Sequence, residues 1–316
     1  MRKMNLLITL TLSLTLVGVA CACGMSSARV TAGEQGGQGT HQHDKSKGEV
    51  GEEMKTNFAV HEQEKKTFAV SGVTQVNVED FEGPIVVRAW DRPEVSFTAD
   101  KQAIDDQSMS GVRVEAQQRG SNILISAKFD KPQRVIKLSG ILMHTNGAFV
   151  KLEVNVPRET NVRLRTGNGQ LSLAGVSGDA DLRTEHGPID VNDGRGRVTA
   201  WTNNGLIRIA NFEGEAEARE MGRNGISLDG SFAKLTAQTG GAPITLALPA
   251  GFDATLETDN GNVVNHGLDL TEEASPSRNV RRWRIGRGGN VLSLRTGNGQ
   301  IILLRADNAR ASAGAK

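Results

Sequence analysis

Three carboxylates are the strongest candidates for catalytic residues in this sequence. Asp190 and Asp193 lie on and just after a predicted strand, and Glu213 begins a run in which every second residue is a glutamate. Columns of carboxylates form the active sites of β-helical enzymes that cleave polysaccharides. Such enzymes also need large loops that build a cleft, and aromatic platforms for sugars, whereas aromatic residues make up only 4% of this chain. We therefore keep a glycan-degrading enzyme as the alternative hypothesis and interpret Glu213, Glu215 and Glu217 as an outward-facing row.

Other catalytic or metal-binding motifs do not occur in the sequence. The stretch GVSGD, which begins at Gly175, lacks the spacing of a GxSxG nucleophile elbow. The six histidines are dispersed without the spacing of a metal site. His186 replaces a corner asparagine and is interpreted as a turn residue. The tract HQHD, His41–Asp44, lies in a polar segment that offers no surrounding residues to orient metal ligands, and it is interpreted as ordinary polar sequence rather than a metal site. We predict no metal and no cofactor.

Basic residues around one tryptophan define a candidate binding patch. The stretch RNVRRWRIGRGG holds five arginines. Arginine beside an exposed tryptophan can bind an anionic glycan, a lipid headgroup or nucleic acid. The alternative is a strand whose apolar side, including Val280, faces the core while the arginines are solvated. The residues of the candidate patch are Arg281, Arg282, Trp283 and Arg284.

The elements that must position these residues come from a repeated motif. The tract LRTGNGQLSL, Leu164–Leu173, returns as LRTGNGQIIL, Leu294–Leu303. Related copies lie between them, spaced by 18 or 19 residues and once by 38, which is twice 19. A fixed period of this size indicates stacked repeats. Aligned on their common position, the copies are anchored at Thr166, Thr184, Thr202, Met221, Thr239, Thr258 and Thr296.

Each copy is typical of two short strands that meet at a corner rich in glycine and asparagine. Apolar and polar residues alternate along each strand, so one face is expected to be buried. Glycine and asparagine tolerate the positive φ that a sharp corner requires. We predict an all-β fold, a parallel β-solenoid with coils of about 18–19 residues in which Leu171, Ile189 and Ile207 stack in one column.

Two rival folds fit the sequence less well. A left-handed hexapeptide helix needs an aliphatic residue every six positions, and counting by six from Val162 meets Asn168. Hairpins of a β-meander need no constant register between copies, whereas here each class of residue returns to the same position in every copy. The solenoid register itself slips within Glu215–Met221, where Arg219 takes a position that should point inward, and we expect a β-bulge there.

The N-terminal segment indicates export. Arg2 and Lys3 precede the short apolar run Leu6–Val19, as in a signal peptide. The following GVACACG is similar to a bacterial lipobox, so we expect lipid on Cys21 or, alternatively, on Cys23. The predicted segments are a lipoprotein-type signal peptide at 1–20, a disordered tether at 21–65, a repeat domain at 66–305 and a frayed tail at 306–316. Within the repeat domain, 66–160 is expected to hold irregular coils and a cap, and 161–305 regular coils.

The motifs resemble a family of bacterial β-strand-repeat proteins of unknown function that carries the name "putative adhesin". The resemblance covers roughly Val70 to Arg305 and rests on three motifs. The first is a GxIxV strand pair, the second a strand that ends in proline before an NG corner, and the third a closing IGxGG segment. They lie at Gly83–Val87, at Val154–Leu171 and again Leu246–Val263, and at Ile285–Ile301. The resemblance implies a right-handed β-helical exported protein, here as a lipoprotein.

Taken together, the sequence predicts a non-enzymatic, membrane-anchored envelope protein that presents a surface for adhesion, binding or assembly. The expected partners are the membrane, an envelope glycan or protein, and a second copy paired through the last coil, Leu292–Leu304. No Asp follows either cysteine, which favours the outer membrane or cell surface. A net charge of +1 gives no reason to expect nucleic acid. A polysaccharide-degrading enzyme and an envelope sensory or regulatory protein are the alternatives.

Overall fold

A computed structural model describes residues 58–131, 133–138, 141–259 and 261–306. The chain divides into Met1–Glu53 and Met54–Lys316, and all described residues belong to the second unit. The predicted signal peptide, Cys21, Cys23 and His41–Asp44 lie outside the described residues, as does the tail from 307 onward. The folded part begins earlier than predicted, because residues 60–65 of the expected tether already form a strand.

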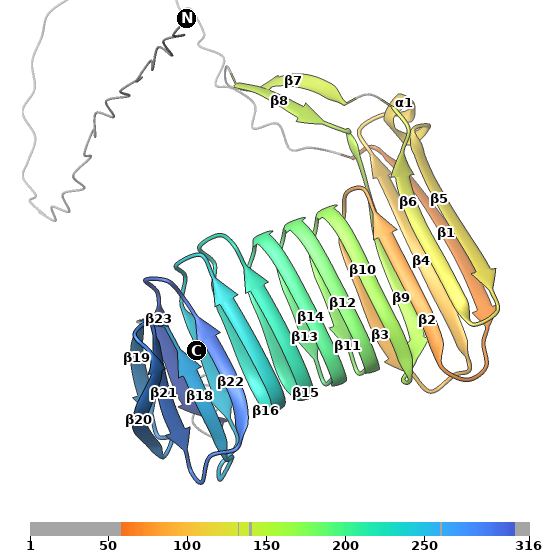
Figure 1. Cartoon of the computed structure of the whole chain (residues 1–316). Helices are drawn as coiled ribbons and strands as arrows, with labels where there is room; N and C mark the ends of the chain where they lie inside the picture. Colours follow the sequence, from red (N-terminus) through yellow and green to blue (C-terminus); the bar gives the residue numbers. More distant parts are fainter. Residues whose placement is uncertain (1–57, 132, 139–140, 260, 307–316) are drawn as a thin grey trace, which may run out of the picture. The chain divides into compact units, whose positions relative to one another are not determined.

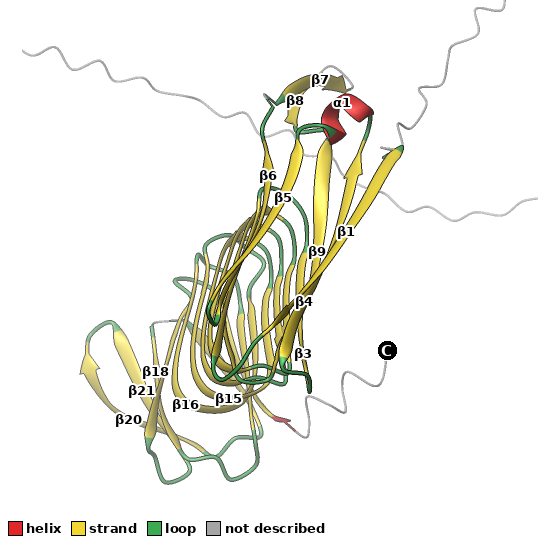
Figure 2. Cartoon of the chain, turned by 90° about the vertical axis from the view of Figure 1, so that its right-hand side faces the viewer, coloured by secondary structure: helices red, strands yellow, loops and turns green. Residues whose placement is uncertain are grey.

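The described residues are almost entirely β, in two ladders of paired strands that face each other across the core (Figures 1 and 2). The first ladder runs in the order β5 (Val112–Arg119), β6 (Asn122–Phe129), β2 (Thr74–Asp80), β10 (Thr160–Asn168), β12 (Ser177–His186), β14 (Arg195–Asn204), β15 (Ile207–Glu220), β16 (Ile226–Thr239), β22 (Asn290–Arg295), β18 (Ala254–Thr258), β21 (Val280–Ile285) and β20 (Leu270–Ser277).

The second ladder shares β15 and β16, which turn the corner and contribute their first halves to it. Its order is β1 (Val60–Ala69), β4 (Glu94–Ala103), β9 (Ala148–Pro157), β3 (Ile85–Trp90), β11 (Leu171–Ala174), β13 (Ile189–Asn192), β15, β16, β17 (Ile244–Leu248), β23 (Gln300–Arg305) and β19 (Asn262–His266). A separate hairpin, β7 (Arg134–Leu138) with β8 (Ile141–Thr145), and the short helix α1 (Asp106–Met109) lie within 66–160, the part of the chain predicted to hold irregular coils and a cap.

The middle of each ladder is parallel and in register. Leu171 pairs with Ile189, and Ile189 pairs with Ile207, so the predicted column of these three residues is confirmed. All three side chains are fully buried. The column continues through Ile226, Ile244, Ile301 and Val263. We call one strand of each ladder, with the corner between them, a rung.

Strand orientation is nevertheless mixed, and the prediction of a parallel fold throughout is wrong at both ends. β1, β4 and β9 pair antiparallel, as do β5 and β6. At the other end β18, β21 and β20 pair antiparallel. A hairpin lets a strand pair with its neighbour in sequence, whereas a parallel pair needs a full crossover. The end strands can therefore finish each ladder without another complete rung.

The last three rungs do not follow the order of the sequence. β22 lies between β16 and β18, and β23 lies between β17 and β19. The interval of 38 residues between the last two copies holds the β20–β21 hairpin instead of a further copy of the repeat. Both edges of the rung Leu292–Leu304 are paired, so the predicted association of two copies through this rung has no free edge to use.

The register slip also has a different form from the one predicted. Thr202 pairs with Glu220, and Glu220 with Thr239, so Glu220 rather than Met221 occupies the anchor position. Glu220 is fully buried and accepts a 2.8 Å hydrogen bond from the backbone N–H of Gly222. Arg219 points outward, and its guanidinium lies 2.8 Å from the carboxylate of Glu217. The expected irregularity is present as a register shift after Gly214.

Buried hydroxyls and glycines hold the corners together. At 3.1 Å, Thr166, Thr184 and Thr202 each donate to the carbonyl oxygen of a corner glycine in the preceding rung. Those buried hydroxyls are thereby satisfied. At Gly187, with φ of 148°, an added Cβ would lie 2.2 Å from the carbonyl oxygen of Gly169, so only glycine allows rungs to approach this closely there.

Candidate functional site

The predicted patch lies on β21 but is not one surface. Alternation along the strand places Arg281 and Trp283 on one face and Arg282 and Arg284 on the other. Trp283 is half-buried against the core, pairs with Leu256, and donates its indole N–H to the hydroxyl of Thr258 at 3.3 Å. The guanidinium of Arg281 lies 4.5 Å from the centre of the Trp283 ring.

Each arginine of the predicted patch has its own carboxylate. Nitrogen–oxygen distances are 2.9 Å for Arg281 with Glu272, 2.7 Å for Arg282 with Glu257 and 3.0 Å for Arg284 with Glu273. An incoming anion would have to compete with these carboxylates. The arginines are therefore half-exposed and ion-paired, and their ion pairs join β21 to β18 and β20.

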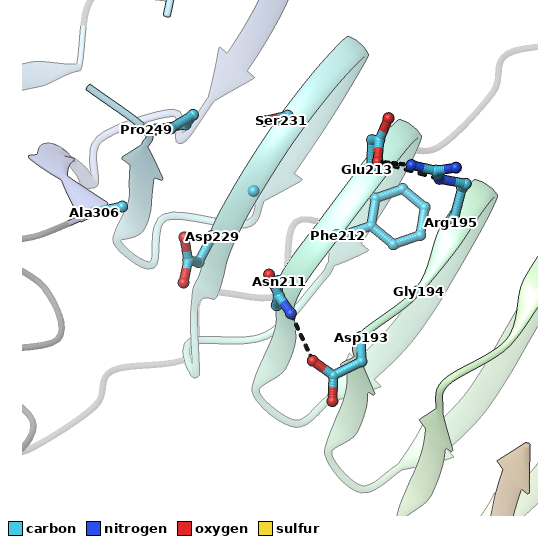
Figure 3. A pocket seen from close by; sticks show the side chains of 11 residues that line it. Asp193, Gly194, Arg195, Asn211, Phe212, Glu213, Asp229, Ser231, Pro249 and Ala306 are labelled. Carbon is cyan, nitrogen blue, oxygen red and sulfur yellow. Dashed lines mark hydrogen bonds and ion pairs between the residues drawn. The ribbon is translucent and has the colours of Figure 1, made fainter. Parts of the chain in front are cut away.

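The three carboxylates of the enzymatic hypothesis bond from rung to rung. Gln170 donates to Asp190 at 2.8 Å, and Asn211 donates to Asp193 at 2.7 Å. Arg195 forms an ion pair with Glu213 (Figure 3). Each of these pairs joins neighbouring rungs. The hydrogen bonds hold the carboxylates as structural acceptors.

Asp193 and Glu213 nevertheless border a shallow cavity of about 380 Å³ at one corner of the rungs (Figure 3). Its wall is formed by the buried ring of Phe212, together with Asn211 and Asp229 from successive corners. Asp193 and Asn211 adopt the left-handed conformation, with φ of 55° and 52°. Two polar pairs of its lining, Asn211 with Asp193 and Arg195 with Glu213, are already engaged with each other.

The structure describes one of the singled-out histidine positions, His186. His186 is exposed and pairs in register with Asn168 and Asn204, as a corner residue should. Among the described residues, no three His, Cys, Asp or Glu side chains come together as a metal site. Within the same residues no helix is long and apolar enough to span a membrane.

A second groove was not anticipated from the sequence. It has a volume of about 540 Å³ and crosses the C-terminal ends of β2, β10, β12 and β14 on the outer side of the first ladder. Its lining includes Glu79, Asp80, Arg165, Arg183, Glu185 and Trp201. Most of these residues stand immediately before or after the anchor position of their repeats. This outward position of the repeat was the signal that could have revealed the groove.

The floor of the groove contains a buried acid. Asp80 is 7% exposed and stands at the anchor position, paired with Thr166. Its Oδ1 accepts from the backbone N–H of Glu82 at 3.2 Å, while its Oδ2 has no partner among the described residues. Burial raises the pKa of the Asp80 carboxyl to about 8, opposed by the hydrogen bond from Glu82. Burial therefore favours the neutral form of this carboxyl near pH 7.

Comparisons with known proteins find relatives by structure alone. No family model matches the chain, and no curated protein matches it. It is similar to a solved "putative cell adhesion protein" of Clostridium sporogenes, over 78% of this chain and 100% of the other, at 10% identity and a TM-score of 0.33. It is also similar to a "putative adhesin" of Bacteroides fragilis, over 77% and 97% of the two chains, at 10% identity and a TM-score of 0.43.

A "putative adhesin" of Parabacteroides distasonis matches over 77% of this chain and 97% of its own, at 10% identity and a TM-score of 0.29. The solved neighbours thus carry the description that the sequence motifs led us to expect. Because their identity and TM-scores are this low, the function of the present chain has to be argued from its own surface.

Proposed function

We propose that this protein is a non-enzymatic, exported β-solenoid that binds macromolecules of the cell envelope through the outer faces of its rungs. Adhesion, the role named for the solved neighbours, is one form of such binding. The proposal rests on the chain's own geometry.

One observation carries the proposal: the rungs from β2 to β22 hold outward side chains in fixed columns. Pairing places Arg165, Arg183, Trp201 and Arg219 side by side on four successive strands. Ladder hydrogen bonds and the buried column fix the spacing of these side chains before any ligand arrives. A surface that is already ordered loses little conformational entropy on binding.

The proposal includes a lipid anchor on Cys21, with Cys23 as the alternative, and a polar tether that holds the folded domain away from the membrane. An acyl chain binds a bilayer through its buried methylenes. Mass spectrometry of the mature protein tests this part. A diacylglyceryl cysteine at residue 21 or 23 is expected, and an unmodified N-terminus beyond Cys23 would overturn it.

The polysaccharide-degrading alternative rests on the cavity beside Asp193 and Glu213. The test compares binding and cleavage by the purified full chain on envelopes of the bacterium that produces it. We expect the chain to be retained on the envelopes without release of new reducing ends. Cleavage that disappears in Asp190→Ala, Asp193→Ala or Glu213→Ala, with folding intact, would establish the enzyme instead.

A further inference from the structure

The groove beside Trp201 has the composition of a recognition site. Trp201 is half-buried and is not among the residues that pack on the core, so its ring is held at the surface. Its pairing neighbours are Arg183 on β12 and Arg219 on β15. An aromatic side chain held among polar groups offers a flat apolar surface beside hydrogen-bonding partners.

Arg219 is paired with Glu217, whereas Arg183 and, one strand further, Arg165 share their counter-charge. Asp181 lies 3.4 Å from Arg163, 3.9 Å from Arg165 and 3.2 Å from Arg183. One carboxylate cannot occupy the donors of three guanidinium groups, each of which has five N–H bonds. Arg165 and Arg183 therefore retain donors that can serve a ligand.

Acceptors balance these donors within the groove. Glu79 and Glu185 line it together with Arg165 and Arg183, so the charged groups of the lining cancel. A polyanion such as nucleic acid gains affinity by neutralising phosphates with an excess of cations, and this groove has no such excess. A ligand rich in hydroxyl groups, which both donate and accept, fits the mixture better.

We infer that the groove binds a neutral glycan chain. One sugar ring of this chain stacks on Trp201, and hydroxyl groups along the rest of the chain are bonded by Arg183, Arg165 and Glu79. This inference rests on the proposed binding function and names its ligand class. Crossing four strands at a spacing of ~4.8 Å gives the groove a length of about 14 Å, which suits an extended oligosaccharide. Its volume of about 540 Å³ lies in the range of ligand sites.

Calorimetric titration of the full chain tests the inference. The probes are the neutral tetrasaccharides chitotetraose, cellotetraose and maltotetraose, with polygalacturonate and oligo-dT as polyanions. We expect at least one neutral probe to bind, and Trp201→Ala to weaken it about tenfold. Trp201→Phe should retain most of the affinity, and Arg208→Gln, an exposed arginine on the second ladder, should retain all of it.

Thermal unfolding of each variant shows whether it is folded. If Trp201→Ala does not fold, Arg183→Gln takes its place in the titration. Failure of every neutral probe to bind, or unchanged affinity in a folded Trp201→Ala chain, overturns the inference. Binding of only the polyanions overturns it as well. If the groove variants still attach to envelopes, the binding surface lies outside the groove: the inference about the groove is then wrong while the proposed function stands. A native chain that attaches to no envelope component contradicts the proposed function itself.

Discussion

Two of the three tryptophans, Trp283 and Trp201, each have arginines on both sides, and their surroundings differ. Beside Trp283 each arginine has its own glutamate, and the indole ring packs on the core. Beside Trp201 several arginines share Asp181, and the ring stays outside the core. One-to-one pairing beside a ring that packs on the core indicates a structural joint, while shared pairing beside a ring outside the core leaves groups available for a ligand.

The buried acid at the opposite end of the same groove from Trp201 gives the largest expected effect. Asp80 titrates near pH 8 when folded and near 3.8 when unfolded. Between these values the folded state holds one more proton at Asp80, so the contribution of Asp80 to the free energy of unfolding falls as pH rises, by up to ~1.4 kcal/mol per pH unit. It should level off above about pH 8, when both states are ionised.

Asp80→Asn removes this titration and can keep the hydrogen bond from Glu82. We expect the variant to be more stable than the native chain at pH 8 and similar to it at pH 4, in urea unfolding at both values. The exposed neighbour supplies the control, Glu79→Gln, which should preserve the native pH profile. Identical pH profiles for Asp80→Asn and the native chain would show that Asp80 does not stay protonated in the folded state.

The two rings themselves should differ in stability. Trp283→Ala removes a side chain that packs on the core and is expected to cost about 2–3 kcal/mol. Trp201→Ala is expected to change the free energy of unfolding by about 0.5 kcal/mol or less, as for other surface sites. Denaturant unfolding of both variants measures the contrast. Equal losses would remove the distinction between a joint and a binding surface.

The smallest expected effect concerns the ion pairs. Glu257→Gln removes the carboxylate that pairs with Arg282, whose Nε is already buried without a partner among the described residues. The loss should lower the free energy of unfolding by about 1 kcal/mol. Asp181→Asn should cost about 0.5 kcal/mol, and added salt should reverse the loss because it screens repulsion between Arg165 and Arg183. Unfolding at low and high salt tests both. A loss for Asp181→Asn that salt does not change would argue against shared pairing.

The sequence predicted the regular part of the fold because each rung repeats one local pattern. Leu171, Ile189 and Ile207 return at equal spacing, and equal spacing is what in-register pairing requires. The exchange of rung order was hidden, because β18–β19 and β22–β23 carry nearly the same motif. Either pair would fit beside β16 and β17, and only the β20–β21 hairpin decides between them.

The candidate site was harder to predict for the same reason. Five arginines close together in sequence drew attention to Trp283, although strand alternation splits the three on β21 between two faces. The groove at Trp201 is assembled from residues 18 positions apart or more, each ordinary within its own repeat. Glu220 was missed because a buried carboxylate replaces a threonine, a substitution that apolar patterning does not detect.

The central claim is that successive rungs hold one outer surface in register. Spin labels at residues 165 and 295, in a chain whose native cysteines are replaced by serine, test it most directly. The column from β10 through β12, β14, β15 and β16 to β22 predicts five inter-strand steps, about 24 Å at ~4.8 Å each. A narrow distribution near this distance supports the account. A distance near ~29 Å, as stacking in sequence order requires, or a broad distribution would contradict it.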